Sequence, residues 1–171
     1  KDCVSLSDIP FPQKLERIGD DAFRACTSLK RISFPEGFHT LGSRAFDVCA
    51  NLESVSFPST LRYIGYWAFG ACKKLKGEIV LPEGFTEMMA GAFRECESIT
   101  SVTFPSTLTH ISGDAFQLCR NIRTVRFPSA LISIGDNAFR DCYHLSEAIL
   151  PESLKHIAPN AFRGCTTMKR L

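Results

Sequence analysis

Cysteine is the residue type of this chain best suited to chemistry, because a thiol can form a disulfide, bind zinc or act as a nucleophile. The chain has 171 residues and 8 cysteines, which recur every 23 or 24 positions. They are Cys3, Cys26, Cys49, Cys72, Cys96, Cys119, Cys142 and Cys165. Such even spacing indicates that each cysteine occupies the same position of a repeated unit, so that stacked units would align the cysteines in one column.

A column of identical side chains limits what these thiols can do. Parallel Cβ atoms of adjacent units would lie about 4.8 Å apart, whereas the Cβ atoms of a disulfide lie about 3.8 Å apart. A tetrahedral zinc site needs ligands that converge from several directions, which a column does not supply. We therefore predict a ladder of buried thiols that pack as small hydrophobic side chains, with no metal site and no cofactor.

The histidines and carboxylates show no catalytic arrangement either. His110 and His156 share one repeat position but lie two units apart, about 10 Å, which is too far to share a metal ion without another ligand. No histidine accompanies a serine or cysteine in a nucleophile motif, and no phosphate-binding loop is present. Acidic residues near Ala-Phe pairs are suited to capping the first N–H groups of short helices. The sequence therefore predicts that this protein is not an enzyme.

A repeat of about 23 residues must position all of these side chains. A cysteine lies three residues after the Phe of each Ala-Phe pair, and a proline follows most cysteines after nine or ten residues. The Ala-Phe pairs lie at 22–23, 45–46, 68–69, 92–93, 115–116, 138–139 and 161–162. This period falls within the range of leucine-rich solenoids, in which units must stack because one unit cannot bury its apolar side chains alone.

Each repeat predicts a short strand followed by turns. Apolar residues alternate before the proline, as at Val55 and Phe57, and the proline ends strand pairing because it has no N–H to donate. Glycine recurs at one later position, where we expect a positive φ, at Gly19, Gly42, Gly65 and Gly135. The predicted fold is an α/β repeat solenoid of 23-residue coils, with a parallel sheet of short strands on one face and turns and short helices on the other.

The pattern Ala-Phe-x-x-Cys-x-x-Leu-x-x-Val-x-Phe-Pro, which runs from Ala45 to Pro58, resembles the BspA-like, or Treponema pallidum-type, leucine-rich repeats. The resemblance covers the chain as a single domain, residues 1–171, with about seven and a half repeats. It implies a secreted or cell-surface protein of bacteria or some protozoa that adheres to host extracellular proteins or to other cells. Because the array begins and ends within a repeat, without a polar capping module, we expect it to be a segment of a longer array.

Composition excludes several other classes of protein. The net charge of +2 argues against a dedicated nucleic-acid binder, which usually carries a strongly basic face. The hydrophobic fraction of 44% is too high for a disordered chain. No apolar run approaches the roughly 18 residues that cross a bilayer, so we predict no membrane insertion. Residues 1–10 show no signal-peptide pattern, so the predicted extracellular location depends on the family resemblance alone.

An aromatic cluster in the least regular part of the array is the first candidate for contact with a protein partner. Its residues are Tyr63, Tyr66, Trp67, Arg44 and Met89. Arg44 precedes Trp67 by one repeat and could stack on the indole ring, while Gly91, one repeat later, would leave the other flank of the ring open. Aromatic residues and methionine are favoured at interfaces. The alternative is that these rings only cover a gap in the convex face.

The outward positions of the strands form a second, weaker candidate, because leucine-rich solenoids commonly bind partners there. Its charged residues are Lys30, Arg31, Arg123 and Arg126. The remaining side chains are small and polar, without the aromatic anchors that usually carry interface energy. We therefore predict a non-catalytic protein-binding or adhesion module, and the alternative is a structural spacer that projects another domain from the cell surface.

Overall fold

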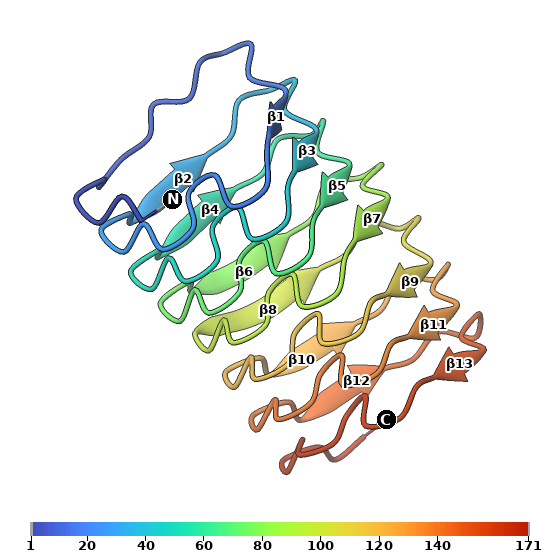
Figure 1. Cartoon of the computed structure of the whole chain (residues 1–171). Helices are drawn as coiled ribbons and strands as arrows, with labels where there is room; N and C mark the ends of the chain where they lie inside the picture. Colours follow the sequence, from blue (N-terminus) through green and yellow to red (C-terminus); the bar gives the residue numbers. More distant parts are fainter. Residues whose placement is uncertain (1, 171) are drawn as a thin grey trace.

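The computed structural model describes residues 2–170, which form an elongated stack of similar coils (Figure 1). The longer strands form one row: β2 (Arg31–Ser33), β4 (Ser54–Ser56), β6 (Gly77–Val80), β8 (Ile99–Thr103), β10 (Thr124–Arg126) and β12 (Glu147–Ile149). All strand pairing between coils is parallel, with partners 22 to 24 residues apart. The predicted parallel-strand solenoid of about 23-residue coils is therefore confirmed.

A second row consists of two-residue strands, which the sequence pattern did not predict (Figure 1). These are β1 (Arg17–Ile18), β3 (Thr40–Leu41), β5 (Tyr63–Ile64), β7 (Glu87–Met88), β9 (His110–Ile111), β11 (Ser133–Ile134) and β13 (His156–Ile157). They pair as β1-β3-β5-β7 and as β9-β11-β13. At the break between the two sheets, the hydroxyl of Ser112 donates a hydrogen bond to the carbonyl of Met88, at 2.6 Å.

The short helices predicted around the Ala-Phe pairs are wrong, because residues 2–170 contain no helix. The Ala-Phe segments instead bond to the next coil: the N–H of Phe46 donates to the carbonyl of Ala68, at 2.8 Å. The residue before each Ala-Phe pair and the residue before each cysteine have positive φ, as at Arg44 (54°) and Val48 (61°). A right-handed helix cannot continue through residues in the left-handed region, so each segment remains a series of turns.

The expectation of positive φ at the recurring glycines is also wrong, because positive φ occurs at other positions. Gly42, Gly65 and Gly135 instead allow successive coils to approach closely, whereas Gly19 does not meet a preceding coil in this way. A Cβ atom built on Gly42 would lie 2.5 Å from the carbonyl carbon of Gly19, and one built on Gly65 would lie 2.5 Å from the backbone nitrogen of Ser43. Only glycine fits where backbones meet this closely.

Aromatic rings form the centre of the stack. The Phe residues of the Ala-Phe pairs stack from coil to coil, with ring centroids 5.2 to 5.6 Å apart. Five of the Phe residues before the prolines add shorter stacks and meet the first ladder edge-on, as Phe57 does with Phe69, at 5.8 Å. The predicted columns of identical core side chains are therefore confirmed, and stacked and edge-on pairs are the arrangements that aromatic rings prefer.

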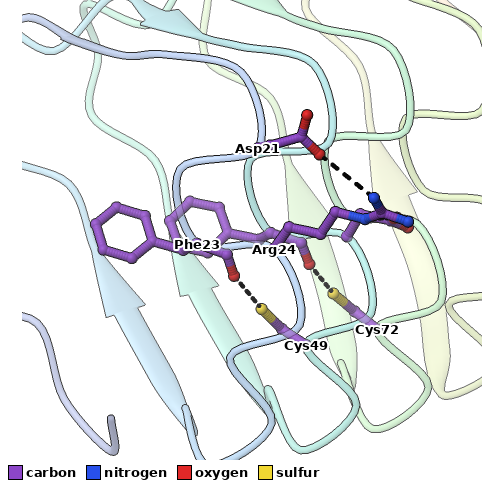
Figure 2. Close-up of polar contacts among 7 residues, drawn as sticks. Asp21, Phe23, Arg24, Cys49 and Cys72 are labelled. Atoms are coloured by element: carbon purple, nitrogen blue, oxygen red, sulfur yellow. Dashed lines mark hydrogen bonds and ion pairs between the residues drawn. The ribbon is translucent and has the colours of Figure 1, made fainter. Parts of the chain in front are cut away.

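The cysteines from Cys26 onward are free thiols, and all of these except the half-buried Cys165 are buried. Each thiol from Cys49 onward donates to a phenylalanine carbonyl of the preceding coil: Cys49 to Phe23 and Cys72 to Phe46, both at 3.2 Å (Figure 2). Burial raises the pKa of the Cys49 thiol to about 12. The predicted thiol ladder is thus confirmed for these cysteines, whereas Cys3 is exposed.

Candidate functional site

Trp67 lies at the corner between β5 and the Ala-Phe segment of its coil, with a positive φ of 55°. The prediction that Arg44 stacks on the indole is wrong. The guanidinium that stacks there belongs to Arg94, 4.5 Å from the ring centroid. Nor is the flank beside Gly91 open: a Cβ atom built on Gly91 would lie 3.0 Å from Nε1 of Trp67. The indole packs against the following coil, and Arg44 in the preceding coil is exposed.

Trp67 and Arg44 nevertheless line one shallow hollow of about 340 Å³, which we call the Trp67 hollow. The other lining residues are Arg24, Asp47, Val48 and Ala71. Asp47 is buried and accepts a hydrogen bond from Nε of Arg24, at 3.1 Å. Burial raises the pKa of the Asp47 carboxyl, and the nearby Arg24 opposes this rise.

The other predicted contact residues, Tyr63, Tyr66 and Met89, do not line this hollow. Tyr66 is 46% exposed, and its carbonyl accepts a hydrogen bond from the N–H of Arg44, at 2.7 Å. Tyr63 is half-buried in β5, and this burial raises the pKa of its phenol. Met89 is half-buried, and its N–H donates to the carbonyl of Ile64. Of the predicted cluster, only Trp67 and Arg44 therefore line the hollow.

Sequence reasoning missed Val48, which is 38% exposed and lines the Trp67 hollow. The corresponding position of other coils carries Ala25, Ala71, Glu95 and Leu118. Because this position carries both apolar and charged residues, the residue type there does not indicate a binding site. The only available clue was that, in each coil, the residue before the cysteine lies four residues after the position that Trp67 occupies in its own coil.

The charged candidates on the strand face do not line a common hollow. Arg31 lines a hollow of about 550 Å³ between residues 8–13, β2 and β4. Arg126 lines a second, of about 510 Å³, along β8 and β10. Arg123 lines a third, of about 320 Å³, and Lys30 lines none of the three. The four side chains therefore do not converge on one hollow.

Two further properties concern residues 2–170 only. In this part of the chain, no three His, Cys, Asp or Glu side chains converge closely enough to hold a metal ion. The same residues form no helix of the length and apolar character needed to span a membrane.

The chain matches known proteins over nearly its whole length. The family model described as BspA type leucine rich repeat region matches residues 1–119 and 86–171, with 6 copies. A leucine-rich repeat protein of Treponema pallidum is 31% identical, with a TM-score of 0.84, over 95% of this chain and 75% of that protein. No relative was found among curated proteins.

Two other solved structures are more distant. A leucine-rich repeat protein from Eubacterium ventriosum is 22% identical, with a TM-score of 0.65, over 93% of this chain and 37% of that one. A leucine rich cell surface protein from Faecalibacterium prausnitzii is 20% identical, with a TM-score of 0.49, over 98% of this chain and 66% of that one. The family model and the Treponema pallidum structure together show that this chain belongs to the BspA-type leucine-rich repeat family.

Proposed function

We propose that this chain is a non-catalytic protein-binding module of a secreted or cell-surface protein, and that the partner contacts the Trp67 hollow. Family membership supports an interaction module, because solenoids present extended surfaces rather than a single enclosed cleft. The observation that carries the proposal is the combination of an indole, exposed apolar surface and charged side chains at one hollow. Tryptophan, tyrosine and arginine are the residues that most often dominate binding energy at protein interfaces.

The Trp67 ring is held in place before any partner arrives. Arg94 covers the ring at 4.5 Å, and the close approach to Gly91 limits its movement. A rigid anchor loses little conformational entropy on binding, which favours affinity. Tyr66, 46% exposed, and Val48, 38% exposed, offer further apolar area. The exposed Arg44 adds a charge that can orient the partner.

The buried thiols argue against cysteine catalysis in this module. The thiolate is the nucleophilic form of cysteine. Burial raises the pKa of Cys72, Cys96 and Cys119 well above the ordinary value, so these side chains stay protonated at neutral pH. Their hydrogen atoms are donated to backbone carbonyls of the preceding coil. The thiol ladder therefore serves packing.

A binding screen tests the proposal. The immobilised chain would be exposed to matrix and plasma glycoproteins at two salt concentrations, beside Tyr66→Ala and Trp67→Ala variants. We expect binding that resists salt and weakens by about tenfold or more in each variant, as removal of an aromatic anchor usually does. Tyr143→Ala is the matched control, because Tyr143 is also a surface tyrosine, 38% exposed, beside an arginine in another coil.

Two outcomes would contradict the proposal. Binding that is lost equally in Tyr143→Ala would show that the Trp67 hollow has no special role. Failure of the folded chain to bind any of the glycoproteins would favour the alternative, a structural spacer. Circular dichroism of each variant would establish that lost binding does not reflect unfolding.

A further inference from the structure

A basic hollow lies among the last coils of the chain, far along the stack from Trp67. It has a volume of about 320 Å³ and is lined by Arg123, His144, Ser146, Thr167 and Lys169. These residues come from three successive coils, and none of them is acidic. We call this site the Arg123 hollow.

The backbone of the stack determines which side chains meet at this hollow. The N–H of Ser146 donates to the carbonyl of Arg123, and the N–H of Lys169 donates to the carbonyl of Ser146, both at 2.9 Å. Arg123, Ser146 and Lys169 therefore occupy one repeat position in consecutive coils. His144 and Thr167 share a second position, two residues earlier.

Hydrogen bonds hold the imidazole and the hydroxyl in place. Nδ1 of His144 lies 2.8 Å from the carbonyl oxygen of Arg120, and the Thr167 hydroxyl donates to the carbonyl of Tyr143, at 2.8 Å. Since a carbonyl can only accept, Nδ1 of His144 carries the hydrogen, and Nε2 is left for solvent or a ligand. The hollow therefore has a pre-arranged polar wall.

Nearby carboxylates do not neutralise the two cations. Glu97 pairs with Lys73 at 3.2 Å and with Arg120 at 3.5 Å, and Glu147 pairs with Arg170 at 3.7 Å. Within residues 2–170, no carboxylate lies within ion-pair distance of Arg123 or Lys169. The hollow consequently retains its positive charge.

The same repeat position shows the opposite arrangement earlier in the stack. There Lys76 pairs with Glu53 of the preceding coil, with Nζ and Oε2 2.9 Å apart. Arg123 instead has Thr100 before it and Ser146 after it at this position, so no acidic residue is available. Arg123 and Lys169 therefore lack the partner that Lys76 has at this position.

The charge of the whole chain shows the same contrast. Residues 119–171 contain eight Lys or Arg and four Asp or Glu, whereas residues 1–118 contain twelve and fourteen. The net charge is therefore +4 in the last part and −2 in the first, although the total is only +2. A local excess of one sign attracts and concentrates ligands of the opposite sign.

We infer that the Arg123 hollow binds a tetrahedral oxyanion, a sulfate or phosphate ester, carried on a glycan. The planar guanidinium of Arg123 matches two oxygens of such a group, and the ammonium of Lys169 adds a second charge. The hydroxyl hydrogens of Ser146 and Thr167 are already donated to the carbonyls of Arg123 and Tyr143, so the two cations supply the contacts to the ligand. This site is separate from the Trp67 hollow, so it extends the proposed function and does not depend on it.

The surroundings favour a short anionic group over a nucleic acid. No aromatic side chain lines the hollow, whereas single-stranded nucleic acids are usually held by bases stacked on aromatic rings. The negative net charge of residues 1–118 would also repel a long polyanion that followed the stack. Small oxyanion esters avoid both problems.

Titration calorimetry on the whole chain tests this inference. The probes are a short heparin-type sulfated oligosaccharide, a short phosphorylated oligosaccharide, a hyaluronan oligosaccharide, which carries carboxylates but no sulfate, and a DNA oligonucleotide. We expect binding of the sulfated or the phosphorylated glycan, whichever is the true source, and much weaker binding of the other two probes. The affinity should fall as salt is raised, because the contacts are exposed charges.

Variants locate the binding on the stack. The double variant Arg123→Gln/Lys169→Gln should bind about tenfold more weakly or worse, because two charge-assisted contacts are lost. Lys30→Gln is the matched control, since Lys30 occupies the same repeat position in an early coil and should leave the affinity unchanged. Unchanged affinity in the double variant, equal loss in the control, equal binding of hyaluronan or DNA, or no binding of either ester would each overturn the inference.

Discussion

The interior Phe ladder and the Trp67 corner obey different rules although they belong to the same coils. In the ladder every coil carries Phe at the same position, and Phe69 stacks on its neighbours at 5.6 and 5.3 Å. In the Trp67 column each coil repeats the positive φ, but the residue changes: Asp21, Arg44, Trp67, Gly91, Asp114, Asn137 and Asn160. All coils therefore share one backbone conformation. They share the same residue type only at positions where the side chain packs against the neighbouring coils.

That difference explains where binding surfaces can develop in this molecule. Replacing a Phe of the ladder by a smaller residue leaves a cavity between the two neighbouring rings. Few residue types are therefore tolerated at this position. At the corner and on the strand face, solvent tolerates most replacements. Both proposed sites, the Trp67 hollow and the Arg123 hollow, therefore lie at positions where the repeat does not require one residue type.

The largest effect is expected from Phe69→Ala. This variant removes a fully buried ring between two others, and it should lower the free energy of unfolding by about 3–5 kcal/mol. Urea unfolding followed by circular dichroism measures the loss. Phe162→Ala, at a half-buried position near the end of the described chain, should cost clearly less. An equal loss in both variants would show that central and terminal coils are equally packed.

A smaller loss is expected from Gly65→Ala. The added Cβ atom would lie 2.5 Å from the backbone nitrogen of Ser43, so the coils must separate locally, at a cost of about 1–3 kcal/mol. Gly19→Ala is the control, because nothing lies within 4 Å of a Cβ atom built there, and its effect should stay within about 0.5 kcal/mol. Thermal unfolding of both variants compares the two positions. If Gly65→Ala were as stable as Gly19→Ala, close approach of the coils would not be the reason for glycine.

Alkaline pH should weaken the interior through the thiol ladder. Burial raises the pKa of Cys49 to about 12 and that of Cys72 and Cys96 well above the ordinary value, whereas unfolding exposes thiols with a pKa of about 8.5. Above that pH the unfolded chain releases protons that the folded chain keeps. The stability from each thiol is therefore complete below about pH 8.5, and it falls by up to about 1.4 kcal/mol per pH unit above it.

Urea midpoints between pH 7 and pH 10 measure this effect. The variant Cys72→Ala/Cys96→Ala should be less stable at pH 7, because it leaves small cavities, but its stability should fall less steeply with pH. Identical slopes in the variant and the original chain would mean that other groups cause the alkaline loss.

The smallest effect concerns which arginine supports Trp67. Arg94→Ala should lower the free energy of unfolding by about 0.5–1 kcal/mol, because the cation stacked on the indole is lost. Arg44→Ala, in the preceding coil, should have almost no effect on stability. Thermal unfolding and the fluorescence of the single tryptophan report both changes. The reverse order would restore the partner expected from the sequence.

The repeat pattern was sufficient for much of the fold but for less of the site. Regular spacing correctly predicted the Phe and Cys columns. The one longer spacing, 24 residues between Cys72 and Cys96, coincides with a register shift between Gly77 and Glu78. The two-residue strands and the absence of helices were not predictable, because they depend on φ values that no residue type at these positions requires. Arg94 was missed because the repeat spacing does not indicate whether the Trp67 indole packs against the preceding coil, which carries Arg44, or the following coil, which carries Arg94.

The sequence by itself determined that the chain stacks, because a period of about 23 residues with apolar side chains at the same positions can be buried only by neighbouring copies. Family membership follows from the same columns. Only the tertiary structure decided which surface side chains share a hollow, such as Trp67 with Val48 and Arg123 with Lys169. The reason is physical: burial constrains a residue type at each position, whereas contacts on the surface depend on the direction of each side chain and on which charges are already paired.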